Sequence, residues 1–324
     1  MALDSDRQSD SGEPAATFGA PAAGADDTGR QVLIGIGMML VAMVIVPVMD
    51  ATAKYLSSDF GTLQLVWARY FFHALFLLPI VAWRYGRRAL YSHRPFMQLV
   101  RGTLLAVSTW LFFAAIARIP LADAIATVFV YPFIVTALSP VILGEPVGIR
   151  RWLAVLVGFS GALIVIRPTG EVVNEGILLA LAAGTSFSFY ALFTRKLAGI
   201  DPPLVTLTFT GIIGAVGASL FLPLTWVTPE IQHWPLLVFL GLCAASGHFL
   251  VILAYERVRA ATLAPFGYFE IVTATLLGFF IFGDFPDRFT WLGIAIIIAS
   301  GIYISNRERT RRVASAEAVP KQQL

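Results

Sequence analysis

Long apolar stretches separated by short polar breaks extend along the chain from Val32 to Ser305. Each stretch is about 18–25 residues long, which is the length that an α-helix needs to cross roughly 30 Å of hydrocarbon. The pattern predicts an all-α polytopic membrane protein. The ten predicted transmembrane helices span residues 32–56, 62–84, 96–118, 121–143, 150–167, 176–197, 203–224, 234–258, 262–283 and 288–305.

The breaks between the predicted helices have the composition of short turns, because Gly, Pro, Asp and Ser predominate in them. Residues 1–29 differ: they are rich in Asp, Ser, Gly, Ala and Pro and have no apolar periodicity. Their acidic side chains have the wrong sign for a signal peptide, so we predict a disordered cytoplasmic tail. The breaks are Ser57–Gly61, Gly144–Pro146, Arg167–Gly170, Asp201–Pro203 and Gly283–Pro286.

Composition agrees with this pattern. Of the 324 residues, 57% are apolar and 13% are charged, whereas about a quarter of the residues are charged in a soluble domain. The net charge of +3 is too small to favour a nucleic-acid partner. The single cysteine, Cys243, excludes an intramolecular disulfide. The sequence has no nucleotide-binding loop and no Cys/His metal spacing, so we expect neither a cofactor nor a metal.

The basic residues predict the orientation. With a cytoplasmic N-terminus, fifteen Lys and Arg residues flank the helices on the cytoplasmic side and three lie in the outer connections. This is the bias of the positive-inside rule, so both termini are predicted to be cytoplasmic. Binding of acidic membrane lipid is a compatible second role. The fifteen are Arg30, Arg84, Arg87, Arg88, Arg94, Arg150, Arg151, Arg195, Lys196, Arg257, Arg259, Arg307, Arg309, Arg311 and Arg312, and the three are Arg118, Arg167 and Arg288.

The two halves of the chain repeat one another. A shift of 139 residues, without gaps, aligns a Gly-acid turn and a Trp-Leu pair in the two halves. Each half holds five predicted helices, and because five is odd the second half enters the membrane from the opposite side. The aligned pairs are Gly144-Glu145 with Gly283-Asp284 and Trp152-Leu153 with Trp291-Leu292, and the predicted segments are a tail at 1–29, repeats at 30–168 and 174–306, and a basic cytoplasmic tail at 307–324.

Ten helices in two halves, each closing with a Gly-acid turn, a Trp and a helix of small residues (Gly158 to Gly161, Ser300-Gly301), resemble the EamA-type branch of the drug/metabolite transporter superfamily. The resemblance covers roughly residues 32–305. It implies secondary transport of a small organic metabolite through a central cavity that both halves form. The substrates of this superfamily include amino acids, nucleoside-like compounds, vitamins and drugs. The segment Asp50–Lys54 is similar to that of bacterial importers of S-adenosylmethionine or riboflavin.

A first group of candidate site residues lies on the outer halves of the first two helices. Asp50 and Arg69 are each about 9–10 Å from the outer end of their helix. Lys54 follows Asp50 by four residues and His73 follows Arg69 by four, so each pair shares a helix face. We expect Asp50 to pair with Arg69 or Lys54, either to fasten the two helices or to form a charged vestibule. Arg101 lies near the inner interface, close enough to snorkel.

A second group lies at the centre of the membrane. Glu270 and His248 have similar depths on consecutive helices, about 12–15 Å from the inner side. The 139-residue shift aligns Glu270 with Tyr131, in the middle of the fourth helix. These residues are candidates for substrate binding or for a coupling proton. The alternative is a neutral Glu270 that is hydrogen-bonded to His248 or to a hydroxyl purely for packing. The prolines expected to interrupt helices and free carbonyls for a cavity are Pro47, Pro132 and Pro265.

The leading hypothesis is a secondary-active transporter of a small organic metabolite that works by alternating access in a bacterial inner membrane. Without a nucleotide-binding loop, uphill transport must use an ion gradient or exchange. One alternative is an intramembrane protease with Ser160 as nucleophile and His248 as base, although the Ser-Gly dipeptide recurs in both halves as a packing feature would. Another alternative is a passive pore. The sequence leaves open the substrate, the direction of transport, the coupling ion and the oligomeric state, a homodimer included.

Overall fold

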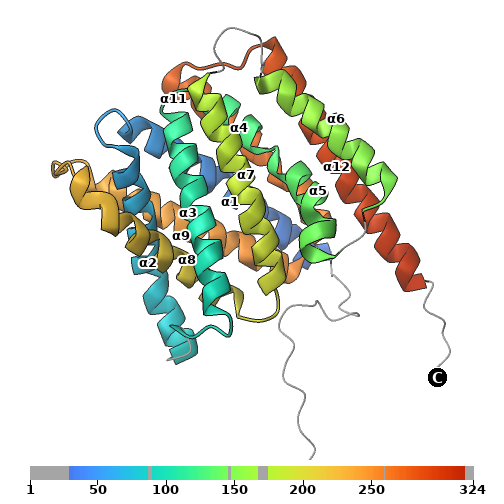
Figure 1. The fold of residues 1–324 in the computed structure, drawn as a ribbon, viewed down its shortest axis with the longest axis horizontal. Coiled ribbons are helices and arrows are strands. Elements are labelled where there is room, and N and C mark those ends of the chain that lie inside the picture. Colours follow the sequence, from blue (N-terminus) through green and yellow to red (C-terminus); the bar gives the residue numbers. More distant parts are fainter. Residues whose placement is uncertain (1–28, 87–89, 145–146, 167–173, 259, 318–324) are drawn as a thin grey trace, which may run out of the picture.

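The computed structural model describes residues 29–86, 90–144, 147–166, 174–258 and 260–317, and every regular element in these ranges is a helix (Figure 1). Eight helical segments are long and apolar enough to cross a membrane, and two shorter apolar helices complete the predicted ten. The predicted fold class is confirmed. The first half comprises α1 (Gly29–Leu56), α2 (Thr62–Tyr85), α3 (Pro95–Ile116), α4 (Leu121–Val128), α5 (Tyr131–Leu143) and α6 (Ile149–Ile166). The second half comprises α7 (Glu175–Leu197), α8 (Pro203–Phe221), η2 (Leu222–Leu224), α9 (Trp234–Arg257), α10 (Ala260–Gly267), α11 (Phe269–Phe282) and α12 (Arg288–Glu317).

Most predicted helix ends lie within a few residues of the observed ends, and the last helix is the exception. We predicted an end at residue 305, but α12 continues to Glu317. Residues 306–317 are rich in Arg, Glu and Ala, which favour helix in water, so hydropathy marks the end of the apolar span and not the end of the helix. The predicted features that lie outside the described residues are the tail at 1–28, the arginines Arg87, Arg88 and Arg259, the turn acid Glu145 and the turn Arg167–Gly170.

The fourth and ninth predicted helices are each divided in two. The chain passes from α4 to α5 through Phe129 and Val130, and from α10 to α11 through Tyr268. The breaks have the spacing of the sequence repeat, because α4 ends at Val128 and α10 ends at Gly267, 139 residues later. Irregular backbone at membrane depth is tolerated only inside protein or beside a cavity. The paired breaks therefore direct attention to the centre of the bundle.

The prolines explain only part of these breaks. Pro132 lies in the first turn of α5, where its missing N–H leaves no intrahelical hydrogen bond unmade. Pro265 lies inside α10, three residues before the break. Pro47 lies inside α1, which continues past it as one helix. The expectation that Pro47 interrupts its helix is therefore wrong: a proline removes one backbone bond, and α9 packs along α1 and holds the two parts in line.

The helices of the two halves pack against one another in a symmetrical scheme. α3 packs along α7 as α9 packs along α1, and α2 packs against α9 as α8 packs against α3. These pairs are equivalent because α1, α2 and α3 of the first half correspond to α7, α8 and α9 of the second. Two further pairs, α2 with α8 and α6 with α12, are each made of two corresponding helices, and α6 and α12 run side by side along one edge (Figure 1). The inverted repeat predicted from the sequence is thus confirmed in the packing.

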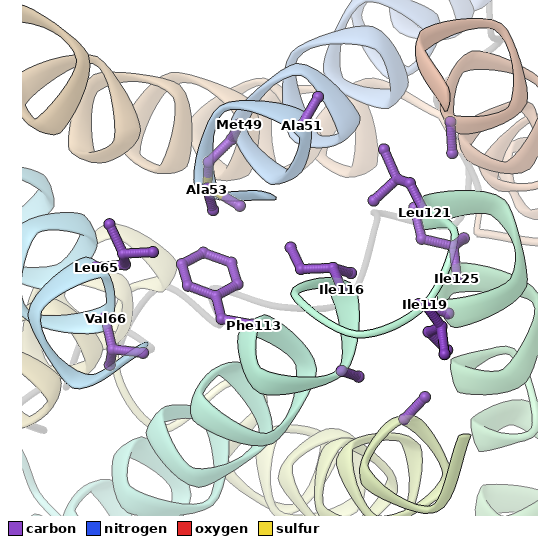
Figure 2. Packing of buried hydrophobic residues seen from close by; sticks show 14 of the residues in the cluster. Met49, Ala51, Ala53, Leu65, Val66, Phe113, Ile116, Ile119, Leu121 and Ile125 are labelled. Carbon is purple, nitrogen blue, oxygen red and sulfur yellow. The ribbon is translucent and has the colours of Figure 1, made fainter. Parts of the chain in front are cut away.

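The bundle has two ends, which we name by their chemistry. The basic face is the end at which α1 begins and α2, α7 and α9 end, each with an arginine in its last turn. The opposite face carries the connections after α1, α3, α8 and α11. Next to the opposite face, buried apolar side chains of α1, α2, α3 and α4 fill the bundle (Figure 2). This apolar cluster includes Ile116 and Leu121, both fully buried, and Phe113, which is 1% exposed.

Candidate functional site

A cavity of about 580 Å³ lies at the centre of the bundle, between the two helix breaks. At one end it reaches Arg195 and Tyr255, exposed side chains in the last turns of α7 and α9 at the basic face. At the other end it stops at Phe113 and Ile125, which belong to the apolar cluster (Figure 2). The cavity is therefore accessible from the basic face and closed toward the opposite face.

Five of the seven predicted site residues line this cavity, and they come from five different helices. The structure thus joins the two predicted groups, one in the outer half and one at the centre, into one site. Lys54 and His73 do not line the cavity. The five residues are Asp50 of α1, Arg69 of α2, Tyr131 of α5, His248 of α9 and Glu270 of α11.

His73 lies behind the cavity wall. It is 1% exposed, its ring centre is 6.2 Å from that of His248, and neither of its nitrogens has a partner among the described residues. α8 covers it closely, because a Cβ added to Gly211 would lie 3.0 Å from the His73 ring. A residue four positions after Arg69 is rotated by about 40° around the helix, and this offset turns His73 away from the cavity.

Arg69 is the buried cation of the cavity, with 5% of its surface exposed. Its Nη1 donates to Oγ1 of Thr109 at 3.0 Å, and its Nη2 lies 3.4 Å from Nε2 of His248. A guanidinium has donors only, so Nε2 of His248 accepts this bond. The guanidinium lies 4.6 Å from the ring centre of Tyr70, whose hydroxyl is 2.8 Å from Thr109 Oγ1. Side chains of α2, α3 and α9 thus hold the guanidinium in place.

Two carboxylates occupy other parts of the wall. Asp50, 3% exposed, and Glu270, in the first turn of α11, make no salt bridge or side-chain hydrogen bond within the described part of the chain. Asp50 interacts electrostatically with Glu270 and with Arg69. The expected direct pairing of Asp50 with Arg69 or Lys54 is wrong, because Thr109 and His248 hold Arg69 while Lys54 binds elsewhere. The expected hydrogen bond between Glu270 and His248 is absent as well.

Aromatic rings form a continuous surface at the helix breaks. This aromatic wall consists of Phe129, Tyr131, Phe187 and Tyr268, all of which line the cavity. Ring centres are 4.9 Å apart for Tyr131 and Phe187 and 5.3 Å apart for Phe129 and Tyr268. The sequence analysis missed three of the four. The repeat could have identified Tyr268, because this residue lies 139 positions after Phe129. The periodicity of α7 gives no sign that Phe187 faces a cavity.

Lys54 lies beyond the cavity, toward the opposite face. Its Nζ donates to the carbonyl of Ile119 at 2.8 Å and to Oδ2 of Asp284 at 3.1 Å, and it lies 5.0 Å from the ring centre of Phe282. Gly283, with φ of 74°, makes the left-handed turn that presents Asp284. These contacts tie the end of α1 to the connection after α3 and to the turn after α11, so both halves contribute to the closed end.

Arg101 is a second arginine buried at membrane depth, and it does not line the cavity. Its Nη2 donates to the carbonyl of Thr206 at 2.6 Å and to the hydroxyl of Thr210, its Nη1 to Thr194 at 3.3 Å, and its Nε to Gln98 at 3.4 Å. The expectation that Arg101 snorkels is wrong: it is 2% exposed, because α7 and α8 supply its acceptors inside the bundle.

Asp201, in the connection between α7 and α8, joins this network at the basic face. Its carboxylate accepts hydrogen bonds from the Ser92 hydroxyl, from the backbone N–H and ring of His93 at 3.1 and 3.0 Å, and from Gln98 at 3.0 Å. Burial raises the pKa of the Asp201 carboxyl, but the hydrogen bonds from Ser92, His93 and Gln98 outweigh this and lower the pKa to about 2.

Sequence reasoning took Asp201 for a turn residue. Its partners lie more than 100 residues away, and no local pattern connects them. We call Ser92, Gln98, Arg101, Asp201, Thr206 and Thr210 the basic-face network.

The protease alternative is not supported by the geometry. Ser160 is exposed and donates to the carbonyl of Val157 in its own helix at 2.7 Å, whereas His248 lines the cavity. No hydrogen bond between Ser160 and His248 is found in the described ranges. A Cβ added to Gly161 would lie 3.0 Å from the carbonyl of Gly293, so this glycine serves the contact between α6 and α12.

Comparisons with known proteins cover both halves of the chain. A sequence model of the EamA-like transporter family matches residues 33–167 and, a second time, residues 174–306. An S-adenosylmethionine uptake transporter of Rickettsia bellii (strain RML369-C) is 31% identical over 278 residues, which are 85% of this chain and 94% of that protein. A riboflavin transporter of Vibrio cholerae is 30% identical over 283 residues, 85% of this chain and 94% of that protein. The fold is also that of a crystal structure 18% identical in sequence, with a TM-score of 0.60 over 88% of this chain and 99% of that chain.

Proposed function

The chain belongs to the EamA-like transporter family, and we propose that it carries a small organic metabolite across a bacterial inner membrane by alternating access. It is a membrane transporter and not an enzyme. The observation that carries the proposal is the central cavity, which combines an aromatic wall with buried charges of both signs and is accessible from one face only.

One-sided access supports alternating access over a passive pore. A pore needs a continuous path, and the apolar cluster blocks it on the way to the opposite face. Beyond the cluster, Lys54 of the first half contacts Asp284 of the second. A rigid-body rearrangement of the halves that breaks this contact and closes the basic face turns the cavity toward the other side.

The substrate proposed first is S-adenosylmethionine. It joins an adenine ring to a sulfonium cation and an amino-acid group, and the cavity holds a partner for each chemical type. The aromatic wall suits stacking of a flat ring, Asp50 and Glu270 suit a cation, and Arg69 suits an anion. The similarity to S-adenosylmethionine uptake transporters agrees with this choice.

Riboflavin is the second candidate. The aromatic wall also suits an isoalloxazine ring, and the riboflavin transporters are similar to the chain over most of its length. Riboflavin offers no charge to match the three ionisable side chains, so we place it second.

Uphill transport is proposed to be coupled to protons through Glu270. This carboxyl lines the cavity next to the α10–α11 break, where a ligand and a proton can both reach it. Glu270→Gln is expected to lose uphill accumulation and its pH dependence while still exchanging substrate. Accumulation with unchanged pH dependence in this variant removes Glu270 from the coupling.

The basic face is proposed to be cytoplasmic, with both termini on that side, because it carries the arginines that the positive-inside rule assigns to the cytoplasm. The structure then has its cavity open to the cytoplasm. Reporter fusions after residue 312 are expected to behave as cytoplasmic and fusions in the 225–233 connection as external. An external C-terminus would overturn the orientation.

Uptake by purified protein in sealed vesicles tests the function. Saturable accumulation of radiolabelled S-adenosylmethionine that collapses with an uncoupler supports the proposed carrier. Saturable uptake of riboflavin alone supports the second candidate. Equilibration without saturation, or no uptake of either compound, contradicts the proposal.

A further inference from the structure

We infer that Arg69 is the subsite for a substrate carboxylate, so that the cavity selects metabolites that carry a zwitterionic α-amino-acid group. The inference rests on the proposed function and concerns the same cavity. On this inference one side chain, Arg69, distinguishes aromatic metabolites that carry a carboxylate from those that lack one.

The hydrogen bonds of Arg69 leave donors unused. A guanidinium has five N–H groups, and within the described ranges its hydrogen-bond partners are Thr109, His248 and the Tyr70 hydroxyl. Its Nε is buried without a partner. No carboxylate of the described residues forms a salt bridge with Arg69, although the side chain is 5% exposed and lines the cavity. Asp50 interacts electrostatically with Arg69 but forms no salt bridge with it, and a buried charge without a directly bonded counterion is unfavourable. An anion that enters the cavity therefore gains a prepared binding partner.

Arg101 provides the internal comparison. It is equally buried and lies on the neighbouring helix α3, but it donates four hydrogen bonds to protein acceptors and does not line the cavity. The fold therefore has the means to satisfy four of the five N–H groups of an arginine where the role is structural. The unused donors of Arg69 are a property of its position on the cavity wall and not of arginines in this bundle generally.

The rest of the wall restricts which anion fits. Asp50 and Glu270 line the same cavity and make no salt bridge within the described part of the chain, so their oxygens can accept hydrogen bonds from a cationic group of the ligand. A zwitterion satisfies both sides, with its carboxylate on Arg69 and its ammonium or sulfonium group near Asp50 and Glu270. Thr109 and Tyr70 fix the guanidinium, so it does not need to be ordered when the ligand binds.

The test compares two ligands that differ by one carboxylate. Binding of S-adenosylmethionine and of decarboxylated S-adenosylmethionine to the purified full chain is measured by calorimetry at neutral pH. The wild type is expected to bind the first compound about 10- to 100-fold more tightly, the range for a lost hydrogen bond between charged groups. Arg69→Gln is expected to bind both compounds alike, and Arg69→Lys to retain a reduced preference. Arg101→Lys, the matched control, is expected to keep the wild-type ratio.

The outcomes separate the subsite from the function. Equal binding of the two compounds by the wild type overturns the carboxylate subsite and leaves the transport of an aromatic cation standing. A preference that persists in Arg69→Gln overturns the assignment to Arg69. No binding of either compound by the wild type overturns the proposed substrate and the subsite with it. The wild-type ratio decides whether a carboxylate subsite exists without any variant, and Arg69→Lys, which keeps the positive charge, tests the assignment to Arg69 if Arg69→Gln does not fold.

Discussion

Arg69 and Arg101 lie on adjacent helices and are both almost fully buried, yet their surroundings have opposite character. Arg101 is enclosed by acceptors from α7 and α8 and is linked through Gln98 to Asp201. Arg69 keeps a buried Nε without a partner and faces a cavity with two carboxyl groups that it does not touch. The basic-face network is closed on itself, and the cavity is open to a ligand.

The difference shows how one bundle uses buried charge for two purposes. Where the protein supplies every hydrogen-bond partner, the charge holds helices of the two halves together. Where partners are missing, the charge costs stability in the empty protein, and a ligand that supplies the partners recovers this free energy. Stability and binding should therefore respond differently to substitutions in the two regions.

The largest expected effect on stability is that of Arg101→Met. Loss of the guanidinium removes the donor to Gln98 Oε1 and to Thr210 Oγ1, while the Thr206 carbonyl keeps the Thr210 hydroxyl as a donor. Together with the lost packing of the side chain, this should lower the free energy of unfolding by about 2–4 kcal/mol. Arg69→Met, the matched control, should cost less than about 1 kcal/mol, because Thr109 keeps Tyr70 as a partner and Nε2 of His248 faces a cavity where water can replace the guanidinium. Denaturant unfolding in detergent, followed by tryptophan fluorescence, measures both. Equal losses would remove the distinction between the two regions.

The next effect in size concerns the support of Arg69. A Cβ added to Gly214 of α8 would lie 2.4 Å from Cγ of Tyr70, the ring that packs on the Arg69 guanidinium. Gly214→Ala should therefore destabilise by about 1–3 kcal/mol and weaken ligand binding by displacing Tyr70.

Gly217 is the matched control for Gly214, since a Cβ there meets nothing within 4 Å. Gly217→Ala should stabilise by up to about 1 kcal/mol through helix propensity. Thermal unfolding measures the stability of the two variants, and ligand titration measures their affinity. Similar behaviour of both variants would mean that Tyr70 does not depend on the close approach of α8.

A smaller effect is expected at the closed end. The Lys54 and Asp284 side chains are 15% and 33% exposed, so their salt bridge is expected to contribute about 1 kcal/mol, or roughly a five-fold shift in the population of the closed state. Lys54→Gln and Asp284→Asn should each increase the labelling rate of a cysteine placed at Ile116, in a Cys243→Ser background. Combining Lys54→Asp with Asp284→Lys should restore slow labelling. If the charge-exchanged double variant does not restore slow labelling, the Lys54–Asp284 salt bridge has no direct role in closing this end.

The smallest effect is a pH dependence of the basic-face network. The pKa of Asp201 is lowered to about 2, below the usual value of about 3.9, so the folded state favours the ionised carboxylate. Its stabilisation is complete above about pH 4 and is lost as the pH falls toward 2. The difference in melting temperature between the wild type and Asp201→Asn should shrink as the pH falls from about 4 toward 2. A difference that persists unchanged at pH 2.5 would argue against the charged hydrogen bonds.

The sequence predicts the fold better than the contacts of the site. Apolar length and the 139-residue repeat predict the ten helices and their inverted arrangement, because hydropathy is a local property. Depth along the helices predicts that Asp50 shares a level with Arg69, and Glu270 with His248. It does not predict that both pairs line one cavity. Pairing depends on rotation around each helix and on partners from distant segments. The partners of Lys54 and Arg101 were therefore beyond the reach of spacing arguments.

The symmetrical packing has a consequence for how the chain is made. The carbonyl that accepts a hydrogen bond from Arg101 belongs to Thr206, 105 residues later in the chain. At a synthesis rate of about 5–20 residues per second, α3 leaves the ribosome roughly 5–20 s before its partner helix α8 exists. During that interval the arginine needs water, lipid headgroups or the insertion machinery to solvate it. The first five helices therefore enter the bilayer as an unfinished structure, and the arrival of the second half completes the fold.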